Sequence, residues 1–178
     1  MWYKQLDKSW TIFLDRDGVI NRRIFGGYVT KIEDFHFISG VLEGLPILAG
    51  KVGKIFIVTN QQGVAKNIMS LDDLHRVHQN MINEIIFSGG RIDYVFSAVN
   101  LKGEVNDQRK PNPFMAHKAK EMFASVEFDK SVMIGDTNSD IIFGNSLGMK
   151  TVLVKSEEII NETPDLLVDS LLDFVKKI

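Results

Sequence analysis

Acidic, hydroxyl and basic side chains follow four short apolar runs in this sequence of 178 residues. In chain order they are Asp15 and Asp17, then Thr59, Lys110 and Asp136. Carboxylates hold hard cations such as Mg²⁺ through their oxygen atoms, while a hydroxyl and an ammonium group bind phosphate oxygens. Any one of these residues is ordinary turn chemistry, but their joint occurrence in this order predicts a phosphoryl-transfer site.

A phosphoryl-transfer site works mainly by positioning and by neutralising charge on the transferred group. Asp15 and Asp136 can hold Mg²⁺, and Asp15 can attack phosphorus to form an aspartyl-phosphate. Asp17 can protonate the leaving alcohol and later deprotonate the hydrolytic water. Thr59 and the amides after it can donate to phosphate oxygens, and Lys110 supplies a positive charge. A calcium loop is disfavoured, because the EF-hand pattern needs further oxygen ligands that this segment lacks.

Short apolar runs alternate with amphipathic stretches along the chain. The runs are almost continuously apolar, which indicates a parallel sheet covered on both faces. Strands that alternate with helices indicate right-handed βαβ units, and therefore a doubly wound, Rossmann-like α/β fold whose ligands bind beyond the carboxyl ends of the strands. The predicted strands are 11–15, 54–59, 94–99, 131–135, 151–154 and 166–168, and the predicted helices are 41–49, 71–87, 113–123, 138–147 and 171–177.

Local signals refine two of these helices. In 71–87, apolar residues recur at spacings of three and four, Ser70 can cap the N-terminus, and Asp73 stands at the capping-box position. Pro46 lies inside 41–49 and predicts a kink or a delayed start, because proline cannot donate a helical hydrogen bond.

Composition limits the class of protein. Apolar residues make up 44% and charged residues 25%, with a formal net charge of −2, as in an average soluble globular protein, and the length predicts one domain over 1–178. Without a basic excess, no nucleic-acid partner is expected, and no apolar run is long enough to span a bilayer. The N-terminal residues lack the apolar core of a signal peptide, so the expected location is the cytoplasm.

Other metal chemistry is disfavoured by the residue types present. The chain has no cysteine, which excludes disulfides, a thiol nucleophile and every cysteine-ligated zinc site. His75 and His78 lie three positions apart on the long predicted helix, a spacing that can support a metal. No third ligand is identifiable nearby, so a surface or core-edge role is the expectation for both.

The motifs together resemble those of the haloacid dehalogenase (HAD) superfamily of phosphatases. The segments that carry this resemblance are Asp15-Arg16-Asp17-Gly18-Val19-Ile20-Asn21, Thr59-Asn60-Gln61, Arg109-Lys110-Pro111, and Gly135-Asp136 with Asp140. A narrower similarity, to the subgroup of heptose bisphosphate phosphatases and histidinol-phosphate phosphatases, rests on Asn21, Tyr28-Val29, Asp34-Phe35, Phe37 and Gly40.

The resemblance implies a HAD-like fold and a role for each matching residue. Asp15 is the implied nucleophile, and Asp17 is the implied acid and base, which also gives a backbone carbonyl to Mg²⁺. Asp136 is the remaining implied metal ligand, and Asp140 would orient the metal shell or Lys110. Thr59 and Lys110 would hold the phosphoryl group, and the implied substrate contacts are Asn60, Gln61 and Arg109.

One departure from the subgroup concerns zinc. Its members commonly carry a Cys/His zinc cluster before the Arg-Lys-Pro triplet, whereas residues 97–108 contain neither Cys nor His. No zinc is therefore expected, and the loop must be ordered by packing or remain mobile.

The spacing of the motifs leaves no room for a separate cap domain. Asp15 and Thr59 are 44 positions apart, and Thr59 and Lys110 are 51 apart, which the required strands and helices nearly fill. We expect an open site shaped by a flap at 22–34 and a substrate loop at 97–109. The cationic residues of these loops could meet a second phosphate or simply be solvated: Arg22, Arg23, Lys31, Lys102 and Arg109.

The first functional expectation is a Mg²⁺-dependent phosphomonoesterase for a sugar (bis)phosphate such as D-glycero-D-manno-heptose 1,7-bisphosphate. Histidinol-phosphate phosphatase activity is the alternative within the same class. A catalytically silent phosphate-binding module is disfavoured, because a binder does not need both Asp15 and Asp17, and the charge balance disfavours a polynucleotide 3′-phosphatase. The expected partner is a small phosphorylated metabolite, without nucleic acid or membrane, for a monomer or weak homo-oligomer.

Overall fold

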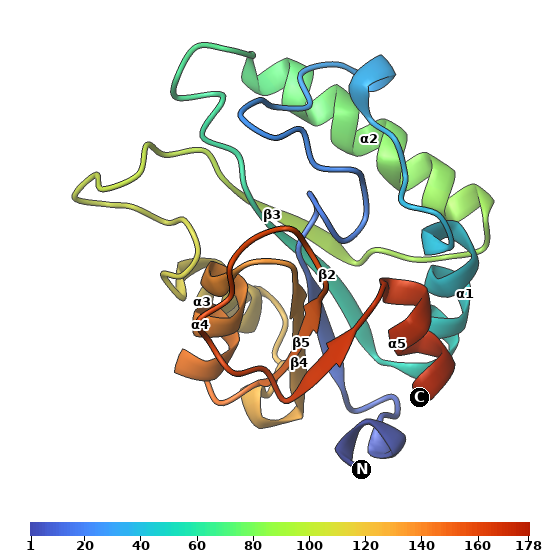
Figure 1. The fold of residues 1–178 in the computed structure, drawn as a ribbon. Helices are drawn as coiled ribbons and strands as arrows, with labels where there is room; N and C mark the ends of the chain where they lie inside the picture. Colours follow the sequence, from blue (N-terminus) through green and yellow to red (C-terminus); the bar gives the residue numbers. More distant parts are fainter.

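The computed structural model describes residues 1–178 and is built on one parallel sheet (Figure 1). Its strands are β1 (Thr11–Leu14), β2 (Lys54–Asn60), β3 (Tyr94–Ala98), β4 (Ser131–Gly135), β5 (Lys150–Val154) and β6 (Leu166–Val168). They lie in the order β3-β2-β1-β4-β5-β6, and every neighbouring pair is parallel. This order reverses between β1 and β4, which confirms the predicted doubly wound α/β fold.

Helices cover both faces of the sheet (Figure 1). They are α1 (Val41–Lys51), α2 (Leu71–Phe87), α3 (Phe114–Met122), α4 (Asn138–Ser146) and α5 (Leu171–Lys177), with short 3₁₀ helices at Trp2–Gln5, Ile32–Asp34 and Phe128–Lys130. Alternate strand residues belong to two apolar clusters on opposite faces of the sheet. Ile12 lies in the cluster that includes residues of α1, α2 and α5, and Phe13 lies in the cluster that includes residues of α3 and α4. Both faces are buried, which is why the strands are apolar throughout.

The capping signals of α2 are confirmed. Ser70 Oγ accepts from the backbone N–H of Asp73 at 3.0 Å, and the Asp73 carboxylate accepts from the backbone N–H of Ser70 at 3.1 Å. A second pair of the same kind begins α4, where Asp140 accepts from the backbone N–H and the hydroxyl of Thr137. Asp140 is thereby held at the start of α4, beside the carboxyl end of β4.

The expectation that Pro46 delays a helix is wrong. Helix α1 begins at Val41 and runs unbroken past Pro46 to Lys51. Proline removes only the hydrogen bond to the carbonyl four residues earlier. That carbonyl belongs to Leu42, a half-buried residue in the first turn of the helix. The burial of Leu45 and Leu48 stabilises the helix around that one missing bond.

Long connections gather at the carboxyl ends of β1 and β2 (Figure 1). The flap that follows β1 is anchored by Val29, which is buried in the core, and by Tyr28, whose hydroxyl accepts from Lys66 at 3.0 Å. The flap, Ile32–Asp34 and α1 fill the interval between β1 and β2, and α2 fills the next one. No helix of the chain has both the length and the apolar character needed to cross a membrane.

We predict that Phe56→Ala lowers the free energy of unfolding by about 3–5 kcal/mol. Phe56 is fully buried, and its ring centroid lies 5.4 Å from that of Phe13 and 4.9 Å from that of Phe123, so truncation leaves a cavity. Urea unfolding measures the change. Phe87→Ala is the matched control, because Phe87 is 92% exposed and its loss should change stability by less than about 0.5 kcal/mol. Similar losses in the two variants would contradict this account of the core.

Candidate active site

A polar cleft of about 370 Å³ lies at the carboxyl ends of the strands, bordered by the flap and by the start of α4. Asp136 and Asp140 lie at the base of this cleft, where their oxygen atoms approach those of Asp15. The structure thus brings the predicted site residues together, and those that line the cleft directly are Asp15, Asp17, Thr59, Asn60, Gln61, Arg109 and Lys110.

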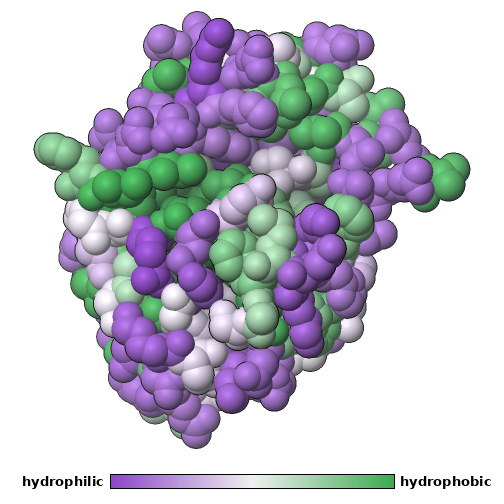
Figure 2. Space-filling model, turned by 180° about the vertical axis from the view of Figure 1, so that it is seen from behind, coloured by the Kyte–Doolittle hydropathy of each residue, from purple (hydrophilic) through white to green (hydrophobic).

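A second, larger cavity of about 610 Å³ lies between α2, β3 and α3. Most of its lining is apolar, with side chains such as Leu74, Ile82 and Phe96. Figure 2, which shows the molecule from behind, has apolar residues gathered in a band with hydrophilic residues on either side. This cavity contains none of the residues predicted for chemistry, so the smaller polar cleft is the candidate active site.

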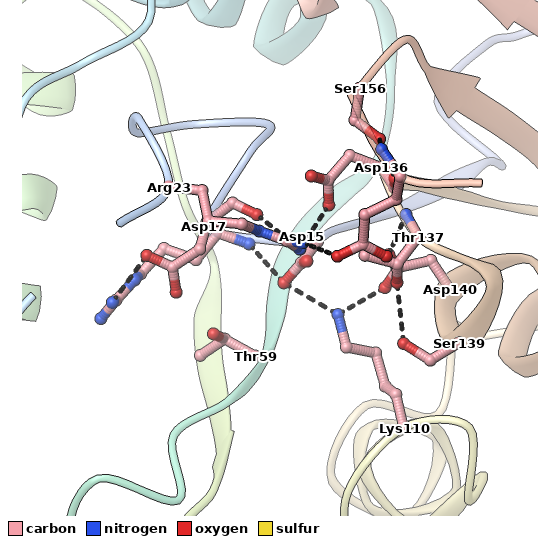
Figure 3. A network of polar contacts seen from close by, with 12 residues as sticks. Asp15, Asp17, Arg23, Thr59, Lys110, Asp136, Thr137, Ser139, Asp140 and Ser156 are labelled. Atoms are coloured by element: carbon pink, nitrogen blue, oxygen red, sulfur yellow. Dashed lines mark hydrogen bonds and ion pairs between the residues drawn. The ribbon is translucent and has the colours of Figure 1, made fainter. Parts of the chain in front are cut away.

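Three carboxylates form the centre of the site. Oxygen atoms of Asp15, Asp136 and Asp140 all lie within 4.8 Å of one another (Figure 3). Strand pairing produces this approach, because β1 and β4 are neighbours and the backbone N–H of Asp15 donates to Ile134 O at 2.9 Å. Gly18 has a φ of +97°, and a Cβ there would collide with the Asp136 carboxylate. The oxygen-rich donor set suits a hard divalent cation.

Lys110 is the cation at the base of the cluster. Its Nζ lies 2.8 Å from Asp15 Oδ1 and 2.6 Å from Asp140 Oδ1, and its side chain is buried (Figure 3). Burial opposes the charge of Lys110, but the Asp140 and Asp15 carboxylates outweigh it and raise the lysine pKa. Lys110 therefore stays protonated and places a fixed positive charge beside Asp15.

Asp140 has both of its oxygens engaged by the protein. Oδ1 accepts from Lys110, and Oδ2 accepts from the backbone N–H and the hydroxyl of Thr137 at 3.0 and 2.6 Å. Gly135 permits this position, because a Cβ there would collide with the Asp140 carboxyl group. The contacts suit the predicted role of orienting Lys110.

Asp17 turns its side chain away from the carboxylate cluster. Oδ1 accepts from Arg16 Nη2 at 3.0 Å and from Asn21 Nδ2 at 2.9 Å, while Oδ2 accepts from Gln61 Nε2 at 2.9 Å. Burial would raise the Asp17 pKa, but the Arg16 guanidinium and these hydrogen bonds lower it. Asp17 is therefore an ionised carboxylate at the cleft surface, and its side chain is 23% exposed.

Asn60, the last residue of β2, and Gln61, which follows it, make connecting contacts that their motif did not reveal. Gln61 Nε2 donates to Thr59 Oγ1 at 2.8 Å as well as to Asp17. Asn60 Nδ2 donates to Lys110 O at 3.0 Å, and Asn60 Oδ1 accepts from Lys110 N at 2.8 Å. Asn60 was predicted to contact substrate, whereas the amide oxygen and nitrogen of its side chain both bond the backbone of Lys110.

Arg23 is a site residue whose contacts the sequence did not predict. Its Nη2 lies 2.9 Å from Asp136 Oδ1 and 3.5 Å from Asp17 O, and its Nη1 pairs with Glu158 (Figure 3). The guanidinium thus contacts two oxygens predicted to bind the metal. No local pattern links Arg23 to partners that lie 113 and 135 positions away.

The cluster carries more negative charge than Lys110 and Arg23 can neutralise. Burial and neighbouring carboxylates raise the Asp15 pKa to about 6, although Lys110 lowers it. Burial and the Asp15 carboxylate raise the Asp136 pKa to about 8, against the effect of Arg23. A divalent cation between these groups would stabilise their ionised forms.

The loop cations differ in their relation to the cleft. Arg23 and Arg109 line it, whereas Arg22, Lys31 and Lys102 are exposed outside it. Arg109 forms no ion pair, and its buried Nε has no hydrogen-bond partner. Its charge is available to an anion in the cleft.

The substrate loop is ordered by its own polar contacts. The Asp107 carboxylate accepts from the backbone N–H groups of Gly103 and Arg109 at 3.0 and 2.9 Å. Asn60 then fixes the following residue, Lys110, through its backbone. These hydrogen bonds connect the loop to Lys110.

The sheet order and the buried Lys110, which pairs with Asp15 after β1 and with Asp140 at the start of α4, are typical of the HAD-like phosphatases. A family model described as HAD-hydrolase-like matches residues 108–174. The chain is 35% identical over 151 residues to the D-glycero-alpha-D-manno-heptose-1,7-bisphosphate 7-phosphatase of Campylobacter jejuni, a match that covers 85% of each protein. It is 31% identical to the corresponding beta-heptose enzyme of Vibrio cholerae, covering 94% of this chain and 92% of that one.

A solved structure has the same fold. The D,D-heptose 1,7-bisphosphate phosphatase from B. bronchiseptica, complexed with magnesium and phosphate, superimposes with a TM-score of 0.85 at 21% identity, covering 94% of this chain and 97% of that one. The chain belongs to the family of the heptose bisphosphate phosphatases within the HAD-like hydrolases, and it is a phosphatase. The family resemblance inferred from the motifs is confirmed.

We predict that, in a metal chelator, the free energy of unfolding falls as the pH rises from about 6.5 to about 8.5. Folded Asp136 keeps its proton up to a pKa of about 8, whereas the unfolded chain releases it near 3.8. The folded state binds more protons in this range, so stability falls by at most about 1.4 kcal/mol per pH unit. Buried His78, with its pKa lowered to about 3, gives an opposite slope that is at half its full size at pH 6.5 and fades by about pH 7.5.

Urea titrations across this pH range measure the slope. Asp136→Asn is the control, because its side chain cannot ionise, and its profile should be flatter than that of the wild type. Parallel profiles would show that Asp136 is not protonated in the folded protein.

Proposed function

We propose that this chain is a Mg²⁺-dependent phosphomonoesterase that works through an aspartyl-phosphate on Asp15. The observation that carries the proposal is the cluster of Asp15, Asp136 and Asp140 around Lys110 at the base of a polar cleft. A phosphatase needs a nucleophile, a cation site and a phosphate-binding charge in one place, and this cluster provides all three.

The residues that would hold Mg²⁺ are the carboxylates of Asp15 and Asp136 and the backbone carbonyl of Asp17. The donor set fits, because all three atoms are oxygens and the cluster is under-neutralised. When bound, the ion would reduce the repulsion between an anionic nucleophile and an anionic phosphate. Arg23 contacts two of these oxygens, so its guanidinium must shift for the ion to bind.

Asp15 is the proposed nucleophile. Its Oδ1 accepts from Lys110 and from the backbone N–H of Arg16 at 2.7 Å, which orients the carboxylate. An Asp15 oxygen attacks phosphorus, the bond from phosphorus to the leaving alcohol oxygen breaks, and an acyl phosphate forms. Lys110 and the Thr59 hydroxyl hold the phosphate oxygens during this step, and Asp140 keeps Lys110 in place.

Asp17 is the proposed acid and base. Its three hydrogen-bond donors favour the ionised form, which suits the second step, where Asp17 takes a proton from the water that attacks phosphorus. That attack releases inorganic phosphate and regenerates the Asp15 carboxylate. In the first step Asp17 must carry a proton for the leaving alkoxide, and the nearby phosphate charge raises its proton affinity.

The proposed substrate is D-glycero-D-manno-heptose 1,7-bisphosphate. Relatives named for its alpha and beta forms both match the chain over most of its length, and both names specify the 7-phosphate. Arg109, unpaired at the rim, supplies a charge for the second phosphate. Histidinol phosphate has no second phosphate, so this arginine favours the bisphosphate.

We also propose that residues 1–178 act as one uncapped domain, with the flap and the substrate loop shaping the entrance. We propose that the chain acts as a monomer or weak homo-oligomer. The proposed partner is a small phosphorylated metabolite, without nucleic acid or membrane, and the polar lining and volume of the cleft support this choice. The proposed location is the cytoplasm.

Phosphate release from a panel of sugar monophosphates and bisphosphates, with histidinol phosphate included, tests the function. We expect turnover with Mg²⁺, a preference for the heptose bisphosphate, and loss of turnover on chelation. Asp15→Asn should lower kcat by at least about 10³-fold, because the amide cannot attack phosphorus. Its melting temperature should stay near that of the wild type. Activity of Asp15→Asn near the wild-type level would refute the proposed nucleophile.

Arg109→Ala should raise KM for the bisphosphate by about tenfold or more and change KM for a monophosphate much less. The expected loss is that of one charge-assisted contact, worth about 1.5–3 kcal/mol. Lys102→Ala is the matched control, because Lys102 lies in the same loop but outside the cleft. An unchanged ratio of the two KM values would remove Arg109 from second-phosphate recognition.

A further inference from the structure

A buried guanidinium connects the acid and base residue to α2. Arg16 is 1% exposed, and its Nη2 donates to Asp17 Oδ1 at 3.0 Å. Its Nη1 lies 3.0 Å from His78 Nε2, and its Nε has no hydrogen-bond partner. His78 is therefore one of only two side chains that hold the guanidinium by hydrogen bonds.

The chemistry of the contact defines the state of His78. Arginine has donors only, so His78 Nε2 must accept and the ring proton must lie on Nδ1. Burial, and then the Arg16 charge, lower the His78 pKa to about 3, in agreement with a neutral ring. The rest of the ring borders the cavity between α2 and β3, where Nδ1 can meet water.

The helix that carries His78 is held firmly. The Ser70–Asp73 capping box closes its N-terminus, and Val77 and Met81 are fully buried in the core on either side of His78. The imidazole is thus a rigid acceptor, whereas Arg16 is a long side chain with many rotamers.

We infer that His78 is a positioning residue for Asp17: it fixes the Arg16 guanidinium, which in turn fixes the carboxylate that moves the proton. This inference rests on the proposed function and adds to it a residue outside the active-site motifs. Without the acceptor, Arg16 Nη1 would be a buried donor without a partner. The guanidinium would rotate to find one, and Asp17 Oδ1 would lose its charged donor, with only Asn21 and Gln61 left to orient the carboxylate.

The variants His78→Gln and His78→Asn test this role as a matched pair. Both are neutral amides, but the glutamine oxygen reaches the position of Nε2, whereas asparagine ends near the position of Nδ1. The quantity to measure is kcat with Mg²⁺ on two substrates. The alkoxide that leaves a sugar phosphate needs a proton, whereas the leaving group of p-nitrophenyl phosphate does not. His75→Asn, at an exposed position one turn away, is the control for changes in the helix.

We expect His78→Gln and His75→Asn to keep kcat within about threefold of the wild type on both substrates. His78→Asn should lose about tenfold or more on the sugar phosphate and much less on p-nitrophenyl phosphate, because proton transfer is worth about 10²–10⁴-fold. Thermal melts of all variants show whether each is folded at the assay temperature.

Two results would overturn the inference. Equal losses for His78→Asn on the two substrates would indicate a structural role only, and equal activity of the glutamine and asparagine variants would show that Arg16 does not depend on this acceptor. The failure of the proposed function has a different signature, since wild-type protein would then release no phosphate from either substrate, and His78 would have no proton transfer to support.

Discussion

Three carboxylates lie close together where β1 and β4 end, and they are buried. The rest of the site must compensate for their negative charge. Buried charges are costly unless they are paired. Lys110 lies between Asp15 and Asp140 and removes part of this cost, but the pKa of Asp136 is still raised to about 8. The site therefore favours any added positive charge, which is the property that a phosphatase needs before an anionic substrate arrives.

The topology of the sheet makes such a concentration of charge possible. Asp15 and Asp136 follow neighbouring parallel strands at the point where the strand order reverses, so no helix crosses between them. Glycine at positions 18 and 135 removes the side chains that would collide with Asp136 and Asp140. The glycine positions and the strand order thus both determine where the same few carboxylate oxygens lie.

Most of the fold and the centre of the site could be predicted, because both depend on patterns of residues that are close together in the sequence. Buried parallel strands are continuously apolar, and Asp15 and Asp136 directly follow two of them. The contacts that were not predicted join distant segments: Arg23 pairs with Glu158 over 135 positions, and Arg16 contacts His78 over 62. The motif predicts that Asn60 lies near the cleft, as it does, but it does not predict the two hydrogen bonds from the Asn60 side chain to the backbone of Lys110.

The base and the rim of the cleft are built differently. In the proposed function, catalysis takes place at the base and substrate choice depends on the rim. At the base, Asp17 accepts hydrogen bonds from Arg16, Asn21 and Gln61, and Asp15 accepts from Lys110 and from the backbone N–H of Arg16. At the rim, Arg109 has no ion pair, and the Asp107 carboxylate bonds the backbone N–H groups of Gly103 and Arg109. In the proposed function, a change in the rim loop would alter which phosphorylated compound fits, whereas the two hydrogen bonds from Asn60 to the backbone of Lys110 would keep this lysine in place.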